Sequence, residues 1–321
     1  MEEKLKVLIG LTSGFSDRYE PLALLRAFKQ NNIHAELLRF DTVTLRFEPN
    51  KLELEAPLKY PIQEYNVLLV RELFKLYASS YPIIEALKTH NPELLVIDNN
   101  IFKDGYVVNK PKQAIKIIKA GLPYPKSIYT LSLETLKENI ASIENYLGYP
   151  MLLKHKSAGK GSGIYKISSR NELFELAKQV SGEDRYGLAK YYLQEFLELK
   201  ADYRILVIGR KIMGAMQRIP KEGDFRANFS LGGTTKPAEL TPIMEEITHK
   251  VINTLDLDFA GVDLVFTKDN KPYLLEVNKI PGFKGFSETY NLNIAQHFVD
   301  FVIQKYKNSK ANKPLSDIYQ A

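Results

Sequence analysis

Short apolar segments alternate with helical segments through the first hundred residues of this chain, and this alternation constrains the fold more than any other feature. The segments expected to form buried strands are residues 5–11, 34–40, 65–71 and 94–98, and those expected to form helices are residues 20–31 and 80–90. Strands that alternate with helices form a parallel sheet, because each helix returns the chain to the same end of the sheet. We therefore predict an N-terminal parallel α/β domain.

The remainder of the chain indicates two α+β subdomains. A helix is expected to open at Asn109-Lys110-Pro111 and to close at Gly121. A pattern of strand, helix, hairpin and helix follows, and then antiparallel strands that end in a helix at 291–306. The predicted ranges are the N-terminal domain at 1–105, a small subdomain at 106–188, a C-terminal subdomain at 189–306 and a flexible tail at 307–321.

Composition excludes several classes of protein. The 321 residues are 45% hydrophobic, which is enough for two or three domains with a buried core. The absence of cysteine excludes disulfides, thiolate metal sites and cysteine nucleophiles. We see no signal peptide and no apolar run near the roughly 18 residues that span a bilayer, so we expect a cytoplasmic protein without a membrane partner. The net charge of +6 favours small anionic substrates over nucleic acid.

Residues 259–278 predict a hairpin that carries three oxygen ligands on one face. A turn centred between residues 269 and 270 places Asp263 opposite Glu276. Asn278 then shares their face, because side chains two apart in a strand point the same way. Two carboxylates and an amide suit Mg²⁺, which completes its shell with phosphates and water. For the hairpin alone, a solvated acidic face without a metal is an equally good interpretation.

A second hairpin, at residues 150–168, encloses a glycine-rich loop. The loop contains Ser157, Gly159, Gly161, Ser162 and Gly163. Its backbone amides can approach phosphate oxygens closely, because glycine has no Cβ. It matches neither the Walker loop nor the GxGxxG fingerprint, and taken alone it is typical of a mobile turn. Lys154, in the apolar strand before the loop, indicates an anion, unless it is a lysine that protects a sheet edge.

Two later stretches of the chain contain further candidates for contact with a nucleotide. Main-chain groups of Glu195, Phe196 and Leu197 are candidates for contact with a planar base. Arg204, Arg218 and Arg226 are candidates to neutralise charge on a transferring phosphoryl group, and Asn228 to add a polar contact near the metal. Each arginine taken separately is more typical of a surface position than of a catalytic one.

The order of these parts resembles the ATP-grasp superfamily. The parts are Lys110 before a helix, Lys154 with its glycine-rich hairpin, QEF, IPKEGDFRANFSLGG, GVDLVF and EVN. In detail the chain resembles the RimK-type ligases, whose members add glutamate to ribosomal protein, coenzyme or amino-acid carrier substrates. The resemblance covers roughly residues 95–305. It implies an ATP-grasp fold, in which ATP lies between the two α+β subdomains.

The resemblance also implies a role for each part. Lys110, Lys154 and the loop at 157–163 would contact the phosphates, Gln194 to Leu197 would contact adenine, and Glu198 would contact the ribose. Asp263, Glu276 and Asn278 would bind two Mg²⁺ ions, with Mn²⁺ as an alternative. The γ-phosphate would pass to a substrate carboxylate, and an amine would then attack the acylphosphate to give an amide, ADP and phosphate. Arg204, Arg218 and Arg226 would stabilise the charge that develops.

The acceptor side departs from the family pattern. The ribosomal-protein-modifying members have a segment resembling SSPG after EVN, whereas this chain has KIPGFKGF. Lys279, Gly282 and Lys284 in this segment are candidate substrate contacts, and the two lysines indicate an acceptor rich in negative charge. Phe229 and Ser230 likewise replace the usual polar pair before LGG. Arg71, at the carboxyl end of a strand, is a candidate anchor for a substrate carboxylate, although a structural strand-end arginine explains it equally well.

Two functions remain open from the sequence. The first is an ATP-dependent ligase that joins glutamate or a similar amino acid to a carboxylate acceptor, which is a coenzyme, peptide or carrier protein. The second is a non-catalytic protein of the same fold that binds ATP as a switch. A homo-oligomer is compatible with either function.

Overall fold

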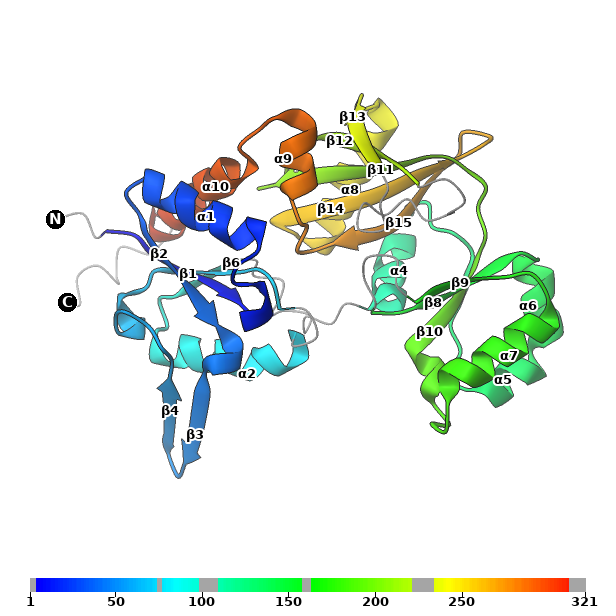
Figure 1. Ribbon diagram of the computed structural model, residues 1–321, viewed down its shortest axis with the longest axis horizontal. Coiled ribbons are helices and arrows are strands. Elements are labelled where there is room, and N and C mark those ends of the chain that lie inside the picture. Colours follow the sequence, from blue (N-terminus) through cyan, green and yellow to red (C-terminus); the bar gives the residue numbers. More distant parts are fainter. Residues whose placement is uncertain (1–3, 74–76, 98–108, 158–162, 221–233, 312–321) are drawn as a thin grey trace.

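The computed structural model describes residues 4–73, 77–97, 109–157, 163–220 and 234–311. Three sheets and a separate hairpin organise these residues (Figure 1). The N-terminal sheet lies on the left of the figure, a large antiparallel sheet lies above, and a small sheet with its helices lies at the lower right. No helix in the part of the chain described here is long and apolar enough to span a membrane.

The N-terminal sheet is parallel, as the alternation predicts. Its strand order is β2 (His34–Arg39), β1 (Lys6–Leu11), β5 (Val67–Val70) and β6 (Leu95–Ile97), and its helices are α1 (Tyr19–Gln30) and α2 (Tyr77–His90). Successive residues of β1 face different cores, since Val7 and Ile9 pack with α1 whereas Leu8 packs with α2. Both faces of the sheet are therefore buried.

A two-stranded hairpin leaves this domain between β2 and β5. It consists of β3 (Thr44–Glu48) and β4 (Lys51–Glu55), and it projects away from the rest of the molecule (Figure 1). Short 3-10 helices flank the surrounding strands at η1 (Ser13–Phe15), η2 (Phe40–Thr42) and η3 (Ile62–Glu64).

The small sheet has the order β7 (Ser127–Ile128), β10 (Tyr191–Glu195), β8 (Met151–His155) and β9 (Ile164–Ile167). The helices α5 (Leu133–Glu138), α6 (Ile140–Leu147) and α7 (Arg170–Ser181) supply its core, and η5 (Gly187–Lys190) leads into β10. Because β10 pairs with both β7 and β8, the small sheet extends to Glu195, beyond the predicted boundary at 188. The division into domains is otherwise still a prediction.

The large sheet has the order β13 (Thr234–Ala238), β12 (Lys211–Ile219), β11 (Leu199–Ile208), β14 (Phe259–Thr267) and β15 (Pro272–Asn278). Helix α8 (Pro242–Leu255) packs on it through Val251 and neighbouring apolar residues. Helix α4 (Lys110–Lys119) precedes the small sheet in the chain, yet it packs on α8 and β15. The small sheet is thus inserted into the unit that contains the large one.

Two short connections join the inserted unit to the large sheet. On the first, Pro123 still accepts a backbone hydrogen bond from Leu274 of the large sheet, whereas Lys126 already pairs with Glu195 of the small one. On the second, Glu198 accepts from the backbone amide of Lys268. Only residues 124–125 and 196–197 lie between these attachment points.

The last helices close the molecule. Helix α9 (Lys284–Tyr290) lies over the large sheet, and α10 (Ile294–Ala311) packs against α1, β6 and β11. Phe298 of α10 shares a core with Val7 of the N-terminal sheet and Phe259 of the large sheet. The prediction of a tail from residue 307 is wrong for its first part, because α10 continues to Ala311. The remaining tail residues lie outside the described ranges.

Candidate functional site

The predicted hairpin forms from β14 and β15, with Asp263 paired to Glu276 as expected. Asn278 pairs with Gly261 two positions farther along the ladder. The register changes by one between Asp263 and Leu264, because Leu275 is an extra residue in β15. The predicted turn centre is therefore wrong by half a residue near the turn, although the predicted pairing holds at the acidic residues.

The bulge determines which side chains of β15 are buried. Without it, Leu274 and Val277 would point to opposite faces, since strand side chains alternate. With one residue added, both lie in the core beneath the sheet. Glu276 is left partly accessible, with its side chain 33% exposed.

A row of charged side chains crosses the sheet from Glu276 through Asp263. Arg204 lies opposite Asp263 on β11 and binds it with both ends of its guanidinium, at 2.6 Å from Nε to Oδ1 and 2.7 Å from Nη2 to Oδ2. Arg218 of β12 donates from Nη1 to Oδ2 of Asp263 at 3.0 Å and from Nε to Asp202 at 2.9 Å. Two carboxylates and two guanidiniums thus compensate one another.

The cluster holds its charges although it is buried. Burial alone would raise the pKa of Asp263, but Arg204 and Arg218 outweigh it and lower that pKa below its usual value. Burial likewise opposes the charge of Arg218, whose pKa nevertheless rises because of Asp263 and Asp202. The arginines are therefore fixed in orientation and permanently charged.

Lys154 lies on β8 of the small sheet, close enough to the charged row for Glu276, Asp202 and Asp263 to act on its charge. Its side chain is buried and donates from Nζ to Oε1 of Gln194 at 2.8 Å, and Gln194 donates in turn to Ser127 at 3.0 Å. Burial lowers the pKa of Lys154 to about 8. β8 lies inside its sheet, so the edge-protection interpretation of this lysine is wrong.

Lys110 connects α4 to the acidic hairpin. Its Nζ lies 3.4 Å from Oε2 of Glu276, and Asn109 caps the helix by accepting from the amide of Lys112 at 3.1 Å. Gln113, one turn later, exchanges two hydrogen bonds of 2.8 Å with the backbone of Val277. Sequence reasoning missed Gln113, because a glutamine in an amphipathic helix gives no signal of pairing with a strand edge.

The expected nucleotide-binding stretch runs along the end of β10. Gln194 is buried beside Lys154, and Glu195 is engaged by Lys126, which donates its backbone amide to Oε1 at 2.7 Å. The Nζ of Lys166 lies 4.3 Å from the centre of the Phe196 ring. The carboxylate of Glu198 is exposed and forms an ion pair of 2.8 Å with Lys268. Leu197 lies in the second connection between the sheets.

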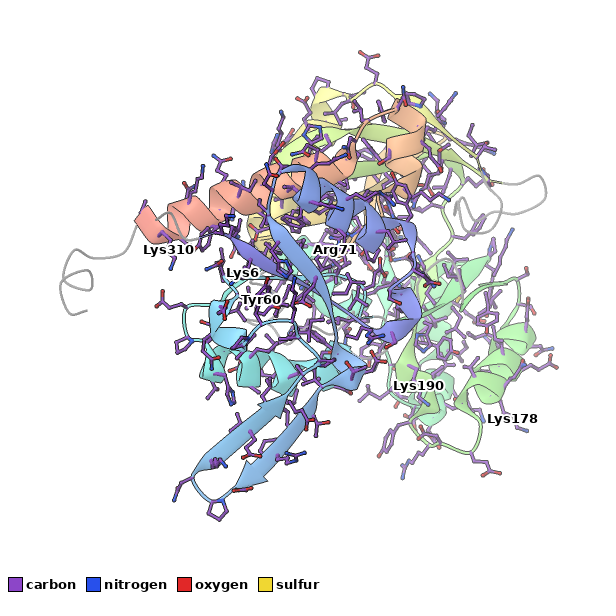
Figure 2. The ribbon with its side chains drawn as sticks, turned by 60° about the vertical axis from the view of Figure 1, so that its left-hand side comes forward. Lys6, Tyr60, Arg71, Lys178, Lys190 and Lys310 are labelled. Carbon is purple, nitrogen blue, oxygen red and sulfur yellow. The ribbon has the colours of Figure 1, made fainter. Side chains whose placement is uncertain are left out.

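Arg71 is fully buried, which favours the structural interpretation of this arginine over the substrate anchor. It is 0% exposed in the interior of the molecule (Figure 2), where Nη2 donates to the carbonyl of Pro281 at 2.7 Å. Its guanidinium lies 4.8 Å from the ring centre of Phe298. The loop that follows β15 covers the strand end where a ligand was expected, so Arg71 fixes that loop.

The loop after β15 is also attached to α1. The amide of Lys284 donates to Glu20 at 3.3 Å, and a Cβ at Gly282 would lie only 3.1 Å from the same carboxylate. The side chain of Lys284 is exposed, at 3.7 Å from Glu288. Lys279, next to Asn278, is half-buried.

Some of the remaining predicted site residues lie within the described ranges, and others lie outside them. Gly159, Gly161, Ser162, Arg226 and Asn228 lie outside the described residues. Ser157 donates its amide to Nδ1 of His155 at 3.1 Å, and the carbonyl of Gly163 accepts from the amide of His155 at 2.8 Å. Gly163 has φ of +68°, a conformation that favours glycine.

The oxygen donors of the acidic hairpin fit a hard cation. The bonds from the two arginines leave Oδ1 of Asp263 with a second lone pair. Oδ1 of Asn278 accepts from the amide of Ile280 at 3.1 Å, and an amide oxygen has two lone pairs. Within the described ranges no group of three or more acidic, histidine or cysteine side chains could hold a metal. A cation here would therefore rely on two carboxylates, an amide and oxygens from a ligand.

Comparisons with known proteins place the chain in a family. The family model described as the RimK-like ATP-grasp domain matches residues 108–302. A probable alpha-L-glutamate ligase 2 of Hahella chejuensis is 30% identical over 200 residues, which cover 62% of this chain and 63% of the relative. That match therefore spans less than two thirds of the relative's own length.

Two other matches cover nearly the whole chain. The glutamate–LysW ligase ArgX of Sulfurisphaera tokodaii is 26% identical over 302 residues, which cover 90% of this chain and 96% of the relative. The structure of the ATP-grasp ligase PsnB with a phosphomimetic variant of its minimal precursor, Mg and ADP has a TM-score of 0.67 at 17% identity. It covers 95% of this chain and 99% of PsnB, and at this identity it supports the fold alone.

Proposed function

Because the chain belongs to the RimK-like ATP-grasp family, we propose that it is an ATP-dependent ligase that joins a carboxylate to an amine through an acylphosphate. One observation supports this most strongly. The charged row on the large sheet contains two arginines that are already oriented and charge-compensated. Such preorganised donors stabilise a transition state more than they stabilise a bound ground state.

The cationic side chains of the two subdomains are assigned to the phosphates. Lys154, from the small sheet, would place its ammonium on a phosphate oxygen, with Gln194 fixing its direction. Lys110, at the start of α4, would bring a second ammonium from the opposite side. The stretch from Gln194 to Leu197 would hold adenine.

The acidic hairpin is assigned to magnesium. Asp263, Glu276 and Asn278 would hold two ions, which supply charge neutralisation along the phosphates when bound. Arg204 and Arg218 would then face the γ-phosphate, the acyl phosphate and the oxyanion formed when the amine attacks. The amide bond forms as the carbon–phosphate oxygen bond breaks, and inorganic phosphate leaves with that electron pair.

We propose a peptide or protein as the acceptor, and glutamate as the amino acid added. Relatives named for ribosomal protein bS6 and for LysW support a macromolecular acceptor, and several relatives are named as glutamate ligases. Lys279 and Lys284 supply positive charge in the segment after the metal strand, which favours an acidic acceptor segment.

The test is phosphate release from Mg-ATP across a grid of amino acids and candidate acceptors, with ADP and AMP resolved. A ligase gives ADP and phosphate only when one particular pair is present. Glu276→Gln serves as the matched control, because it should retain the fold and lose turnover. Tight ATP binding without turnover across the grid would contradict the ligase and favour the ATP switch.

A further inference from the structure

The β3–β4 hairpin is exposed in a way that the ligase chemistry does not explain. Its strands pair with each other and form a separate two-stranded sheet. An isolated pair of strands is marginally stable in water, and open strand edges readily accept further strands. The hairpin therefore has backbone groups and side chains suited to a partner.

The two faces of the hairpin differ in chemistry. Cross-strand pairs Leu45 with Leu54 and Phe47 with Leu52 share one face. Phe47, near the tip, is 77% exposed. A large aromatic side chain at that exposure marks a contact surface when it lies in a continuous apolar face.

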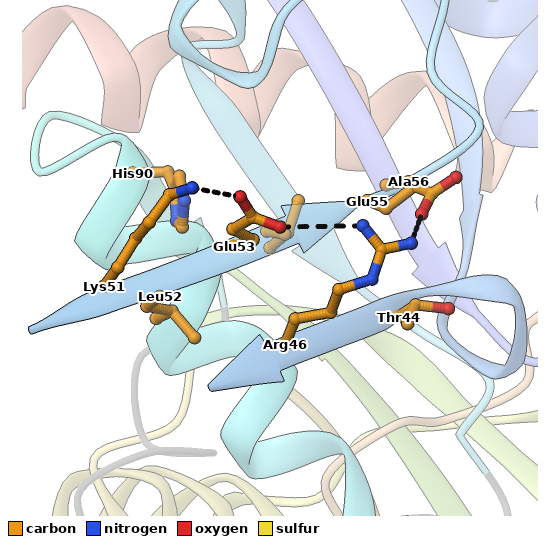
Figure 3. Close-up of a pocket in the computed structure, with 9 residues that line it drawn as sticks. Thr44, Arg46, Lys51, Leu52, Glu53, Glu55, Ala56 and His90 are labelled. Carbon is orange, nitrogen blue, oxygen red and sulfur yellow. Dashed lines mark hydrogen bonds and ion pairs between the residues drawn. The ribbon is translucent and has the colours of Figure 1, made fainter. Parts of the chain in front are cut away.

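The opposite face carries alternating charges (Figure 3). Arg46 binds Glu53 at 3.5 Å and Glu55 at 2.9 Å, and Lys51 also forms an ion pair with Glu53. These residues line an open hollow of about 710 Å³ that His90 of α2 borders. Glu48 is exposed, and no ion pair is found for it among the residues that the structure describes.

The two edges of the hairpin are not equivalent. β4 lies against α2, and Leu54 packs on the core beneath it. β3 forms the opposite edge. It contains no proline or glycine between Thr44 and Glu48, so each of its residues can both donate and accept a backbone hydrogen bond.

We propose that β3 pairs antiparallel with β3 of a second copy of this chain, about a two-fold axis at Phe47. The hairpins then form a four-stranded sheet whose apolar face is continuous across both copies. The interface is isologous, since the same residues contribute from each side. This assembly rests on the hairpin alone and does not depend on the proposed ligase function.

The charges of β3 select this register. In a two-fold antiparallel pair, opposite residues share a face, so their numbers add to an even sum. An axis at Phe47 places Arg46 opposite Glu48 of the other copy, and the symmetry repeats this pair on the other side of the axis. An axis at Arg46 or Glu48 instead places like charges opposite each other, and an axis at Leu45 places Arg46 opposite Thr44. Only the register centred on Phe47 pairs opposite charges.

The first test measures self-association by sedimentation velocity from about 1 to 100 µM, a range that brackets weak dimers. The intact chain should form a dimer, and Phe47→Lys should weaken it by at least about tenfold. Arg46→Glu creates like-charge pairs and should also weaken it. The fourfold variant Arg46→Glu, Glu48→Arg, Lys51→Glu and Glu53→Arg restores opposite charges both across the axis and between the strands of each hairpin, so it should recover most of the affinity.

A second test uses the absence of cysteine from the natural chain. Phe47→Cys places two thiols next to the axis, where opposite Cα atoms of an antiparallel pair lie about 5.5 Å apart, within disulfide range. Mild oxidation should give a covalent dimer. Glu55→Cys is the matched control, because it is exposed on the same hairpin but lies away from its own copy.

Two results would overturn the proposal. The intact chain would be a monomer throughout the concentration range, or it would be a dimer whose affinity is unchanged in both Phe47→Lys and Arg46→Glu. Equal disulfide formation by Phe47→Cys and Glu55→Cys would also contradict the register.

Discussion

The two sheets that face the candidate site hold their charges in opposite ways. On the large sheet, Asp263 lies between two arginines, and the cluster is neutral before any ligand arrives. On the small sheet, Lys154 is buried with the neutral amide of Gln194 as its hydrogen-bond partner. The first arrangement is charge-compensated alone, whereas we propose that a phosphate anion compensates the second.

The difference separates two requirements of a phosphoryl-transfer site. Groups that act in the transition state gain from being fixed in advance, because no reorganisation is then needed during the reaction. A group that binds the incoming phosphate gains from an unsatisfied charge, because the ligand then relieves the cost of its burial. The low pKa of Lys154 is the sign of that cost.

The largest expected effect is at Asp263, which both arginines share. In Asp263→Ala, the buried guanidinium of Arg218 and the half-buried guanidinium of Arg204 lose their shared carboxylate, so the free energy of unfolding should fall by about 3–5 kcal/mol. Denaturant unfolding measures this loss. The control Glu276→Gln lies on a partly exposed side chain and should change stability by less than about 1 kcal/mol. Equal losses in both variants would contradict the compensated cluster.

Arg218 tests whether the cluster acts in the reaction. Arg218→Ala should lower kcat by about a hundredfold to a thousandfold, with a much smaller change in ATP affinity. Turnover and nucleotide binding are measured on the same preparation, with Arg218→Lys to separate charge from planar geometry. If only the apparent affinity for ATP changed, the transition-state role would be wrong.

Removing the charge of Lys154 should raise the free energy of unfolding, whereas removing that of Asp263 should lower it. Because its pKa falls from 10.5 to about 8, the unfolded state binds more protons between these values, and stability should rise with pH across that window. Lys154→Met removes the buried charge and should stabilise the protein by about 1–3 kcal/mol at pH 7, while weakening ATP binding. Unfolding curves of the natural chain and of Lys154→Met at pH 7 and pH 10 measure the two changes in stability, and nucleotide titration measures the change in ATP affinity.

The same residue predicts how ATP affinity depends on pH. As the pH rises above about 8, Lys154 loses its proton, so ATP affinity should fall by up to about tenfold per pH unit. Lys154→Arg keeps its charge and should show a flatter profile. A wild-type profile that matches that of Lys154→Arg would remove Lys154 from the phosphate site.

The smallest expected effect concerns Gln113. Gln113→Ala removes two hydrogen bonds to the edge of β15 and should lower stability by about 1–2 kcal/mol. It should reduce turnover less than tenfold, because Lys110 and Glu276 are retained. Gln113→Glu keeps the acceptor for the amide of Val277 but turns the donor that faces the Val277 carbonyl into a second acceptor, so unfolding measurements should show a loss at least as large.

Local pattern predicted the parts of this site that depend on strand alternation. The pairing of Asp263 with Glu276 was predicted correctly because the extra residue of the bulge offsets the half-residue error in the predicted turn centre. The bulge itself was not, because Leu275 looks like any other apolar residue of the strand. Lys154 was recognised as unusual, but its place inside the sheet depends on β10, which is separated from it by a helix.

Arg71 shows where sequence reasoning fails. The rule that ligands gather at the carboxyl end of parallel strands assumes that this edge is open. Here the segment after β15 covers it, and Pro281 takes the guanidinium. That contact joins residues 210 positions apart, so no local pattern contains it.

The two connections of the inserted unit limit how the protein can move. Each contains only two residues between its last hydrogen bond to the large sheet and its first pairing with the small one. Two short connections allow rotation about the line that joins them and resist twisting about other axes, and the backbone hydrogen bond from Lys110 to the carbonyl of Lys156 must break when the inserted unit swings away from α4. The small sheet should therefore swing as a single flap, and a probe pair placed across the hinges would report one opening coordinate.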